Sequence, residues 1–266
     1  MKKIFLCCDI EGTAGICAWD ETEWGDPRNE YFRAQMSREA SSACLGALDA
    51  GADEIFVKDA HDSARNINPE LLPENVRIFR EWGRHPFSMM AGLDETFDGV
   101  IFTGYHSAAG MNTNPLSHTM NTQNMYVKIN GEITSELMLN SMIASYVGVP
   151  VYMVTGDKGL CEWMKSRCPG TTVVPVSEGF GAGSVSMHPA AAVKAIRENA
   201  EKAVRAKKED CMFPLPEHFN VEICFKKHMK ASGAKWYPGC RQTGVFTVEY
   251  DADDLMDVLK FIYWVL

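Results

Sequence analysis

The chain has 266 residues, of which 46% are hydrophobic and 23% are charged, as in ordinary globular proteins. A net charge of −9 and the lack of a Lys/Arg cluster exclude nucleic acid as the main ligand. No apolar run reaches the roughly 18 residues of a membrane span, and the first one stops at Asp9, too early for a signal peptide. Nine cysteines without C-x-x-C spacing favour reduced thiols in the cytoplasm over disulfides or a structural zinc site.

The stretch that follows the first apolar run carries the most chemical information. Residues 3–8 (KIFLCC) predict a short buried strand, after which Asp9 and Glu11 follow with one residue between them. A backbone that is still extended there points both carboxylates to the same side. Since two like charges held that close repel each other, we expect a positive group, such as a metal ion, between them.

Two further strands end in histidines. A helix over residues 31–50 and a strand over residues 54–58 form a βαβ unit, so the strands at 3–8 and 54–58 are expected to be parallel neighbours. His61 follows the second strand, and His106 follows the buried strand at residues 100–104. Because ligands bind at the carboxyl ends of the strands in open parallel sheets, Asp9, Glu11, His61 and His106 are expected to meet there.

The other expected elements complete an α/β fold with a mostly parallel central sheet flanked by helices. A catalytic domain over residues 1–210 and a small C-terminal α+β region over residues 211–266 are expected, with prolines at the junction. The remaining elements, in chain order, are an edge strand 76–79, a helix 86–97, a polar loop 108–124, a hairpin 126–134, a helix 135–147, a strand 150–155, a helix 160–167, a strand 172–176, a Gly-rich loop 178–184, a helix from 189 to about 208, strands 220–225 and 243–250, and a helix 252–266.

Carboxylates combined with imidazoles favour zinc or a similar first-row divalent metal over magnesium, which prefers oxygen ligands and water. One of the carboxylates could bridge two metal ions about 3.5–4 Å apart, an arrangement used for hydrolysis. The residues themselves thus predict a metal-dependent hydrolase, without deciding its substrate.

Six short motifs in order along the first half of the chain carry a resemblance to a known family. They are DIEGTAG at 9–15, DAHDS at 59–63, GLDETF at 92–97, GYHSA at 104–108, LSHTM at 116–120 and SELMLN at 135–140. In this combination the chain resembles the D-aminopeptidases of the bacterial dipeptide-transport type, which are dizinc peptidases that assemble into hollow rings. The similarity is weaker towards the C-terminus.

The resemblance implies a role for each matching residue. Asp9 bridges two Zn²⁺ ions per subunit, Glu11 and His61 complete one site, and His106 and Glu136 complete the other. His118, in the polar loop, matches the catalytic histidine of the family, as nucleophile or as general acid or base. The implied protein is a cytoplasmic homodecamer that removes N-terminal D-amino acids from short peptides.

Two positions near the predicted centre allow a purely structural role. The role of Glu136 comes from the resemblance alone, and a carboxylate in the first turn of a helix is also favoured by the helix dipole. Cys7 departs from the family, in which a serine is common at this place. By strand alternation it points to the same side as Asp9, where it could support or bind a metal, although core packing is the commoner role of a free cysteine.

Two other functions remain open from the sequence. DIEGT also resembles the nucleophile loop of haloacid-dehalogenase-like phosphatases, with Asp9 as the phosphorylated residue, Mg²⁺ as cofactor and Gly156-Asp157 as a later metal-binding turn. That chemistry has Asp in place of Glu11 and no use for the histidines. A ring-forming scaffold that binds metal without catalysis is the third possibility, and it has no need for His118.

Overall fold

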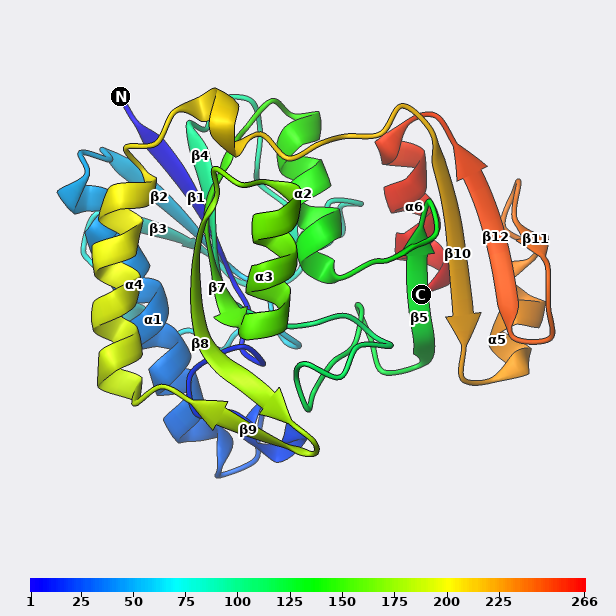
Figure 1. Ribbon diagram of the computed structural model, residues 1–266, viewed down its shortest axis with the longest axis horizontal. Helices are drawn as coiled ribbons and strands as arrows, with labels where there is room; N and C mark the ends of the chain where they lie inside the picture. Colours follow the sequence, from blue (N-terminus) through cyan, green and yellow to red (C-terminus); the bar gives the residue numbers. More distant parts are fainter.

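The computed structural model describes residues 1–266 and contains two β-sheets with helices around them (Figure 1). The central sheet has seven strands in the order β3-β2-β1-β4-β7-β8-β9, and all its pairs are parallel except β8 with β9. Its strands are β1 (Lys3–Cys8), β2 (Glu54–Asp59), β3 (Val76–Phe79), β4 (Gly99–Tyr105), β7 (Val151–Asp157), β8 (Thr172–Phe180) and β9 (Gly183–Ser186). The predicted α/β fold with a mostly parallel sheet is confirmed.

Helices cover both faces of the central sheet, which is why its inner strands are mostly apolar. Every residue of β4 and β7 is buried. Helices α1 (Asn29–Asp49) and α4 (Pro189–Ala203) lie side by side on one face (Figure 1). On the other face lie α2 (Glu136–Tyr146) and α3 (Lys158–Arg167).

A second, antiparallel sheet lies beside α2, with α6 between them (Figure 1). Its order is β11-β12-β10-β5-β6, and its core joins that of the α2 face of the central sheet. The elements are β5 (Asn124–Ile129), β6 (Glu132–Ile133), β10 (Phe219–Phe225), α5 (His228–Ala234), β11 (Arg241–Gln242), β12 (Thr247–Ala252) and α6 (Leu255–Val265). The hairpin β5–β6 thus pairs with strands from the end of the chain, and the division into residues 1–210 and 211–266 stays a prediction.

Several expected elements differ from the structure. Residues 86–97 do not form a helix: only a short 3-10 turn occurs there, Ser88–Met90, because the left-handed residues Ser88 and Gly92 interrupt any helical run. The expected Gly-rich loop at 178–184 is mostly strand, since β8 continues to Phe180 and turns into β9 through Gly181, whose φ is +61°. Helix α4 ends at Ala203, before the expected residue 208.

The hairpin and the helix that follows it form as predicted. Asn130 and Gly131 both have positive φ, as a type I′ turn requires, and Ser135 caps α2 by accepting a hydrogen bond from the Met138 amide (3.1 Å). This cap places Glu136 in the first turn of α2. No helix in the structure combines the length and the apolar character that crossing a membrane requires.

One buried carboxylate ties α1 to the loop that follows β1. Glu39 Oε1 accepts hydrogen bonds from the Ala14 amide and from Gln35 Nε2, both 3.0 Å away, while Oε2 is buried without a partner. Burial raises the pKa of Glu39 from 4.5 to about 7. Because the folded protein favours the protonated form, this contribution to stability is complete below the unfolded pKa and is lost as the pH rises through about 7.

Glu39→Gln removes this titration and keeps the shape of the side chain. We expect the unfolding free energy of the variant, relative to the wild type, to rise by ~2 kcal/mol between pH 5 and pH 8. Denaturant titrations at both pH values measure it. Glu30→Gln, at an exposed position of the same helix, is the control, and an equal pH dependence in both variants would contradict the assignment to Glu39.

Candidate metal centre

Three neighbouring strands of the central sheet deliver acidic and imidazole side chains to one edge. Asp9 follows β1 directly, His61 stands two residues after β2, and His106 follows β4 directly. Glu136 reaches the same place from the first turn of α2. All four are at least 92% buried. The structure therefore brings Asp9, His61 and His106 together, as the sequence predicts.

Glu11 arrives by a different route from the expected one. β1 ends at Cys8, and residues 10–13 form a turn closed by a hydrogen bond from the Thr13 amide to the Ile10 carbonyl (2.9 Å). The turn packs so tightly on β4 that a Cβ at Gly12 would lie 1.8 Å from the Tyr105 carbonyl oxygen. Glycine is therefore required for the turn to place Glu11 beside Asp9.

His61 is oriented by a main-chain carbonyl. Its Nε2–H donates to the carbonyl oxygen of Thr22 (3.0 Å), which leaves Nδ1 facing the two carboxylates. Nδ1 lies 3.3 Å from Asp9 Oδ1 and 3.2 Å from Glu11 Oε2. These three side chains form one group of atoms that could hold a cation.

His106 is oriented in the same way on the other side of Asp9. Its Nδ1–H donates to the carbonyl oxygen of Ser107 (3.0 Å), and Nε2 has no hydrogen-bond partner. Nε2 lies 3.5 Å from Asp9 Oδ2 and 3.6 Å from Glu136 Oε1. Asp9 thus presents one oxygen to each histidine and is common to two potential cation sites.

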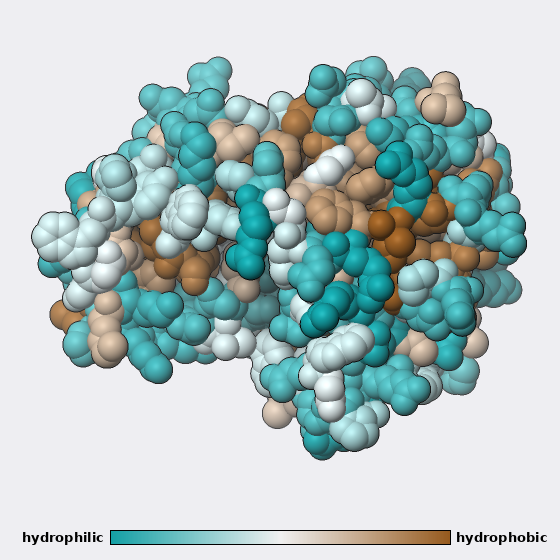
Figure 2. Space-filling model, turned by 180° about the vertical axis from the view of Figure 1, so that it is seen from behind, coloured by the Kyte–Doolittle hydropathy of each residue, from teal (hydrophilic) through white to brown (hydrophobic).

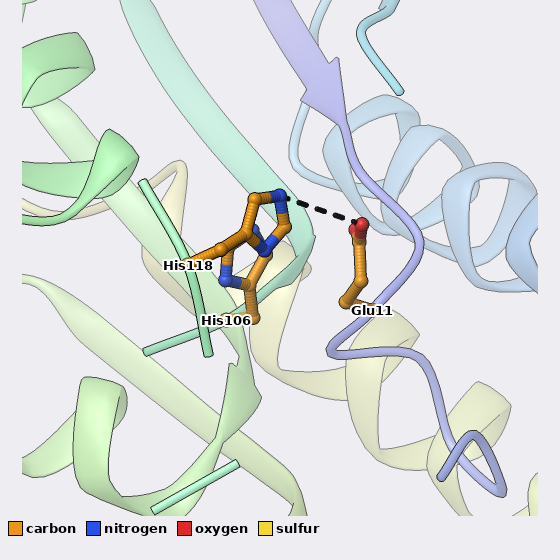
Figure 3. A group of neighbouring side chains, drawn as sticks. All are labelled: Glu11, His106 and His118. Carbon is orange, nitrogen blue, oxygen red and sulfur yellow. Dashed lines mark ion pairs between the residues drawn. The ribbon is translucent and has the colours of Figure 1, made fainter. Parts of the chain in front are cut away.

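His118 comes from the loop between β4 and β5, and its ring stacks on that of His106 with centroids 4.2 Å apart (Figure 3). Its Nδ1–H donates to the Leu116 carbonyl (2.9 Å), and Nε2 lies 3.8 Å from Glu11 Oε1 and 3.6 Å from Glu136 Oε1. Burial, and next the charge of His106, lower the pKa of His118. Its Nε2 therefore faces the acids as an unprotonated nitrogen.

The electrostatics of the carboxylates indicate a missing positive charge. Burial, and next the charge of Glu11, raise the pKa of Asp9 to about 8. Burial also opposes the ionisation of Glu11, but the positive charge of His61 beside it outweighs burial and holds the pKa of Glu11 well below its usual value. Asp9 Oδ2 and Glu11 Oε2 are buried without hydrogen-bond partners. Buried acceptors of this kind are rarely left unsatisfied in proteins.

The donor set fits a pair of zinc ions. Bonds of about 2.0–2.1 Å at tetrahedral angles separate two ligand atoms by about 3.3 Å, and the histidine-to-carboxylate distances around Asp9 are 3.2–3.6 Å. Each histidine donates its second ring N–H to a carbonyl, the usual orientation of a metal-binding imidazole. The unpartnered atoms of Asp9, Glu11 and His106 are those that would bind the ions.

Two orienting groups were not found from the sequence. The Thr22 carbonyl fixes His61, and the Met120 amide donates to Glu136 Oε1 (2.7 Å). Both are main-chain groups, which leave no residue-type signal. Met120 has a φ of +63°, an uncommon conformation for a non-glycine residue, and its residue type does not reveal this.

A cavity of about 610 Å³ opens above these side chains. Trp19, Trp82 and Met120 form part of its wall, and Trp19 packs edge-on against His118 with ring centroids 5.2 Å apart. No lysine or arginine lines the cavity, whereas five of its lining residues are acidic. A ligand with a positively charged end suits this surface better than one with a carboxylate.

The fold and site define an α/β protein with an acid and histidine centre suited to divalent metal ions. The family model for D-aminopeptidases (Peptidase_M55) matches residues 1–264, so the chain belongs to the D-aminopeptidase family. A D-aminopeptidase of Bacillus subtilis (strain 168) is 31% identical over 261 residues, which span 97% of this chain and 94% of the relative. The chain is accordingly a hydrolase of the metallo-aminopeptidase class.

A solved structure agrees with this assignment. It is described as the Zn-dependent D-aminopeptidase DppA from Bacillus subtilis, a self-compartmentalizing protease. It superposes with a TM-score of 0.91 at 28% sequence identity and covers 99% of this chain and 96% of its own. The expected family and fold are both confirmed.

The phosphatase alternative is not supported. Family membership speaks against it, and so does the position of Asp157, which that mechanism would use in a metal-binding turn. Its carboxylate caps α3 by accepting a hydrogen bond from the Leu160 amide (2.9 Å) and belongs to none of the potential cation sites.

Cys7 lies beneath the centre without facing the acids. Its Sγ accepts a hydrogen bond from the Tyr105 hydroxyl (3.0 Å) and donates to the Met89 carbonyl (3.3 Å). Burial raises the pKa of this thiol to about 12, so it stays protonated near neutral pH. Cys7 belongs to no potential cation site.

Cys7→Ser is expected to leave the metal content of the purified protein and its turnover unchanged, because a serine hydroxyl can keep both hydrogen bonds. Metal analysis and a peptidase assay measure the two quantities. Cys8→Ser, at a neighbouring buried position of β1, serves as the control for folding defects. Loss of one metal equivalent in Cys7→Ser alone would mean that the thiol is a ligand.

Proposed function

We propose that the protein is an aminopeptidase with two zinc ions per subunit that removes N-terminal, preferably D-configured, amino acids from short peptides. Asp9 would hold both ions, Glu11 and His61 would complete one site, and His106 and Glu136 would complete the other. The observation that carries this proposal is the position of the two carboxylate oxygens of Asp9: Oδ1 faces His61, and Oδ2 faces His106. Zinc supplies two functions when bound: it lowers the pKa of water and polarises the peptide carbonyl.

His118 is the catalytic residue in this proposal. Its Nε2 faces the cavity unprotonated, because Nδ1–H is held by the Leu116 carbonyl, and can accept a proton or attack there. Glu11, His106 and His118 also form a group that could hold a cation. A role for His118 in catalysis and a role in binding metal therefore make different predictions for its removal.

The cavity favours the amino end of a peptide. Apart from the residues proposed to hold the ions, the acidic lining residues Glu23 and Asp62 suit a free ammonium group, whereas a substrate carboxylate finds no lysine or arginine to pair with. The aromatic wall formed by Trp19 and Trp82 offers apolar surface to a short side chain. These features support removal of residues from the amino terminus.

We further propose that ten subunits form a ring in the cytoplasm. The structural relative is described as self-compartmentalizing. Large apolar side chains are exposed on this chain, among them Trp236 (81%) and Trp264 (72%), and Figure 2 shows apolar patches bordered by hydrophilic residues on one face. All nine cysteines are unpaired, as the reducing interior of a cell would keep them.

His118→Ala tests the function. The zinc-loaded wild type is expected to hydrolyse D-alanyl p-nitroanilide faster than its L-isomer and to leave p-nitrophenyl phosphate intact. The variant should keep two zinc ions per chain and lose about 10²–10⁴-fold in kcat, the usual contribution of a general acid or base. Metal analysis and kinetics on the same samples measure both.

His85→Ala is the matched control, since His85 is exposed and does not line the cavity. It should keep wild-type kcat and metal content. Unchanged turnover in His118→Ala would refute the catalytic role, and loss of a zinc ion from that variant would assign His118 to the metal instead. Phosphatase activity with Mg²⁺ in the wild type would overturn the proposal as a whole.

Sedimentation of the purified protein tests the assembly. A decamer of this 29.6 kDa chain should sediment as a particle of ten times that mass. Trp264→Glu, which puts a charge on the exposed end of α6, is expected to shift the distribution towards smaller species because burying a charge at an interface is unfavourable. A wild type that sediments as a monomer at micromolar concentration would rule out the ring.

A further inference from the structure

Another buried carboxylate, Asp157, lies outside the proposed metal ligands. It is the last residue of β7 and caps α3, its side chain is fully buried, and it forms no ion pair. Four donors surround it instead. Oδ1 accepts from Ser107 Oγ–H (2.6 Å) and the Leu160 amide (2.9 Å), while Oδ2 accepts from the Ser107 amide (2.6 Å) and from Asn114 Nδ2 (3.4 Å).

Capping α3 accounts for only one of these four contacts. A helix N-cap needs a single acceptor, and Asn serves there as well as Asp. Burying an anion without a counter-charge is unfavourable unless its hydrogen bonds compensate. The other three contacts all go to the segment that joins His106 to His118.

Ser107 connects Asp157 to both histidines. It follows His106 in the chain, and its amide and hydroxyl are the two groups that Asp157 binds at 2.6 Å. Its carbonyl oxygen accepts from His106 Nδ1–H (3.0 Å) and from the His118 amide (3.3 Å). The position of Ser107 therefore sets the direction of the His106 ring and the place where His118 enters the site.

Asn114 makes a second connection. Besides Asp157, its Nδ2 donates to the Glu11 carbonyl (3.2 Å), and its Oδ1 accepts from the Leu116 amide (2.8 Å). The Leu116 carbonyl in turn holds Nδ1–H of His118. One carboxylate at the end of β7 thus fixes segments that carry Glu11, His106 and His118.

We propose that Asp157 is a positioning residue: through Ser107 and Asn114 it holds His106 and His118 at the separation and orientation that zinc binding and peptide hydrolysis require. The proposal rests on the proposed function for its catalytic part only, because the orientation of His106 and the affinity for zinc can be measured without any substrate. Asp157 does not line the cavity and is not expected to contact a peptide.

Asp157→Asn is the first test. The amide keeps one oxygen acceptor, which is enough to cap α3, but its NH₂ group cannot accept a hydrogen bond from Ser107. We expect zinc affinity, measured by chelator competition on the holoprotein, to fall about 10-fold, within the range for residues that orient metal ligands. We expect kcat per zinc-loaded chain to fall by a similar factor while KM stays within about twofold. Because a smaller folded fraction would lower apparent kcat in the same way, kcat is referred to the zinc bound in each sample.

Asp254→Asn is the matched control, because Asp254 caps α6 through the Met256 amide (2.7 Å) away from the cavity. It should leave zinc affinity, kcat and KM unchanged. Ser107→Ala removes only the hydroxyl contact and is expected to give a smaller loss. Since both changes break one shared interaction, the double variant should lose less in kcat than the product of the single losses.

A crystal structure of Asp157→Asn supplies a readout that is independent of metal and substrate. The expected result is a rotated Ser107 peptide and loss of the hydrogen bond between His106 Nδ1–H and the Ser107 carbonyl. The proposal is overturned if that bond stays in place, if zinc affinity stays within twofold of the wild type, or if the two losses multiply. A wild type without peptidase activity would instead refute the proposed function and leave the zinc and crystallographic tests valid.

Discussion

The main constraint on this structure is that three carboxylates are buried close together, where ionising all of them is unfavourable. Asp9, Glu11 and Glu136 converge from two segments of the chain. Burial, and next the charge of Glu11, raise the pKa of Asp9 to about 8. Divalent cations remove the conflict, because they turn repulsion between the acids into attraction towards a shared centre. The turn at Gly12 places Glu11 beside Asp9, and the cap of α2 places Glu136 in the first turn of its helix, so both features bring the acids together.

Much of the site could be predicted because its positions follow local signals. Asp9, His61 and His106 each come just after a short apolar run, and the rule that parallel strands end at one edge brings such residues together without any knowledge of side-chain packing. Glu136 had no such signal. Its helix approaches the edge through tertiary packing, so only the likeness to the family pointed to it.

The errors have equally specific causes. Residues 86–97 carry apolar side chains at helical spacing, but Ser88 and Gly92 adopt positive φ and break the run. Residues 178–184 contain three glycines, which usually indicate a loop, yet here they allow a tight turn between paired strands. Glu11 lies beside Asp9 because a turn follows β1. Strand alternation thus predicted that the two carboxylates are close, although the backbone between them is not extended.

The orientation of the imidazoles has a consequence for mutational surveys. The atoms that hold His61 and His118 are the main-chain oxygens of Thr22 and Leu116, and every amino acid has such an oxygen. Replacing either side chain leaves the acceptor where it was. An alanine scan would therefore report the lost core packing of Leu116 and the lost hydroxyl contact of Thr22 with the Trp19 carbonyl, but not the carbonyl oxygens that orient His61 and His118.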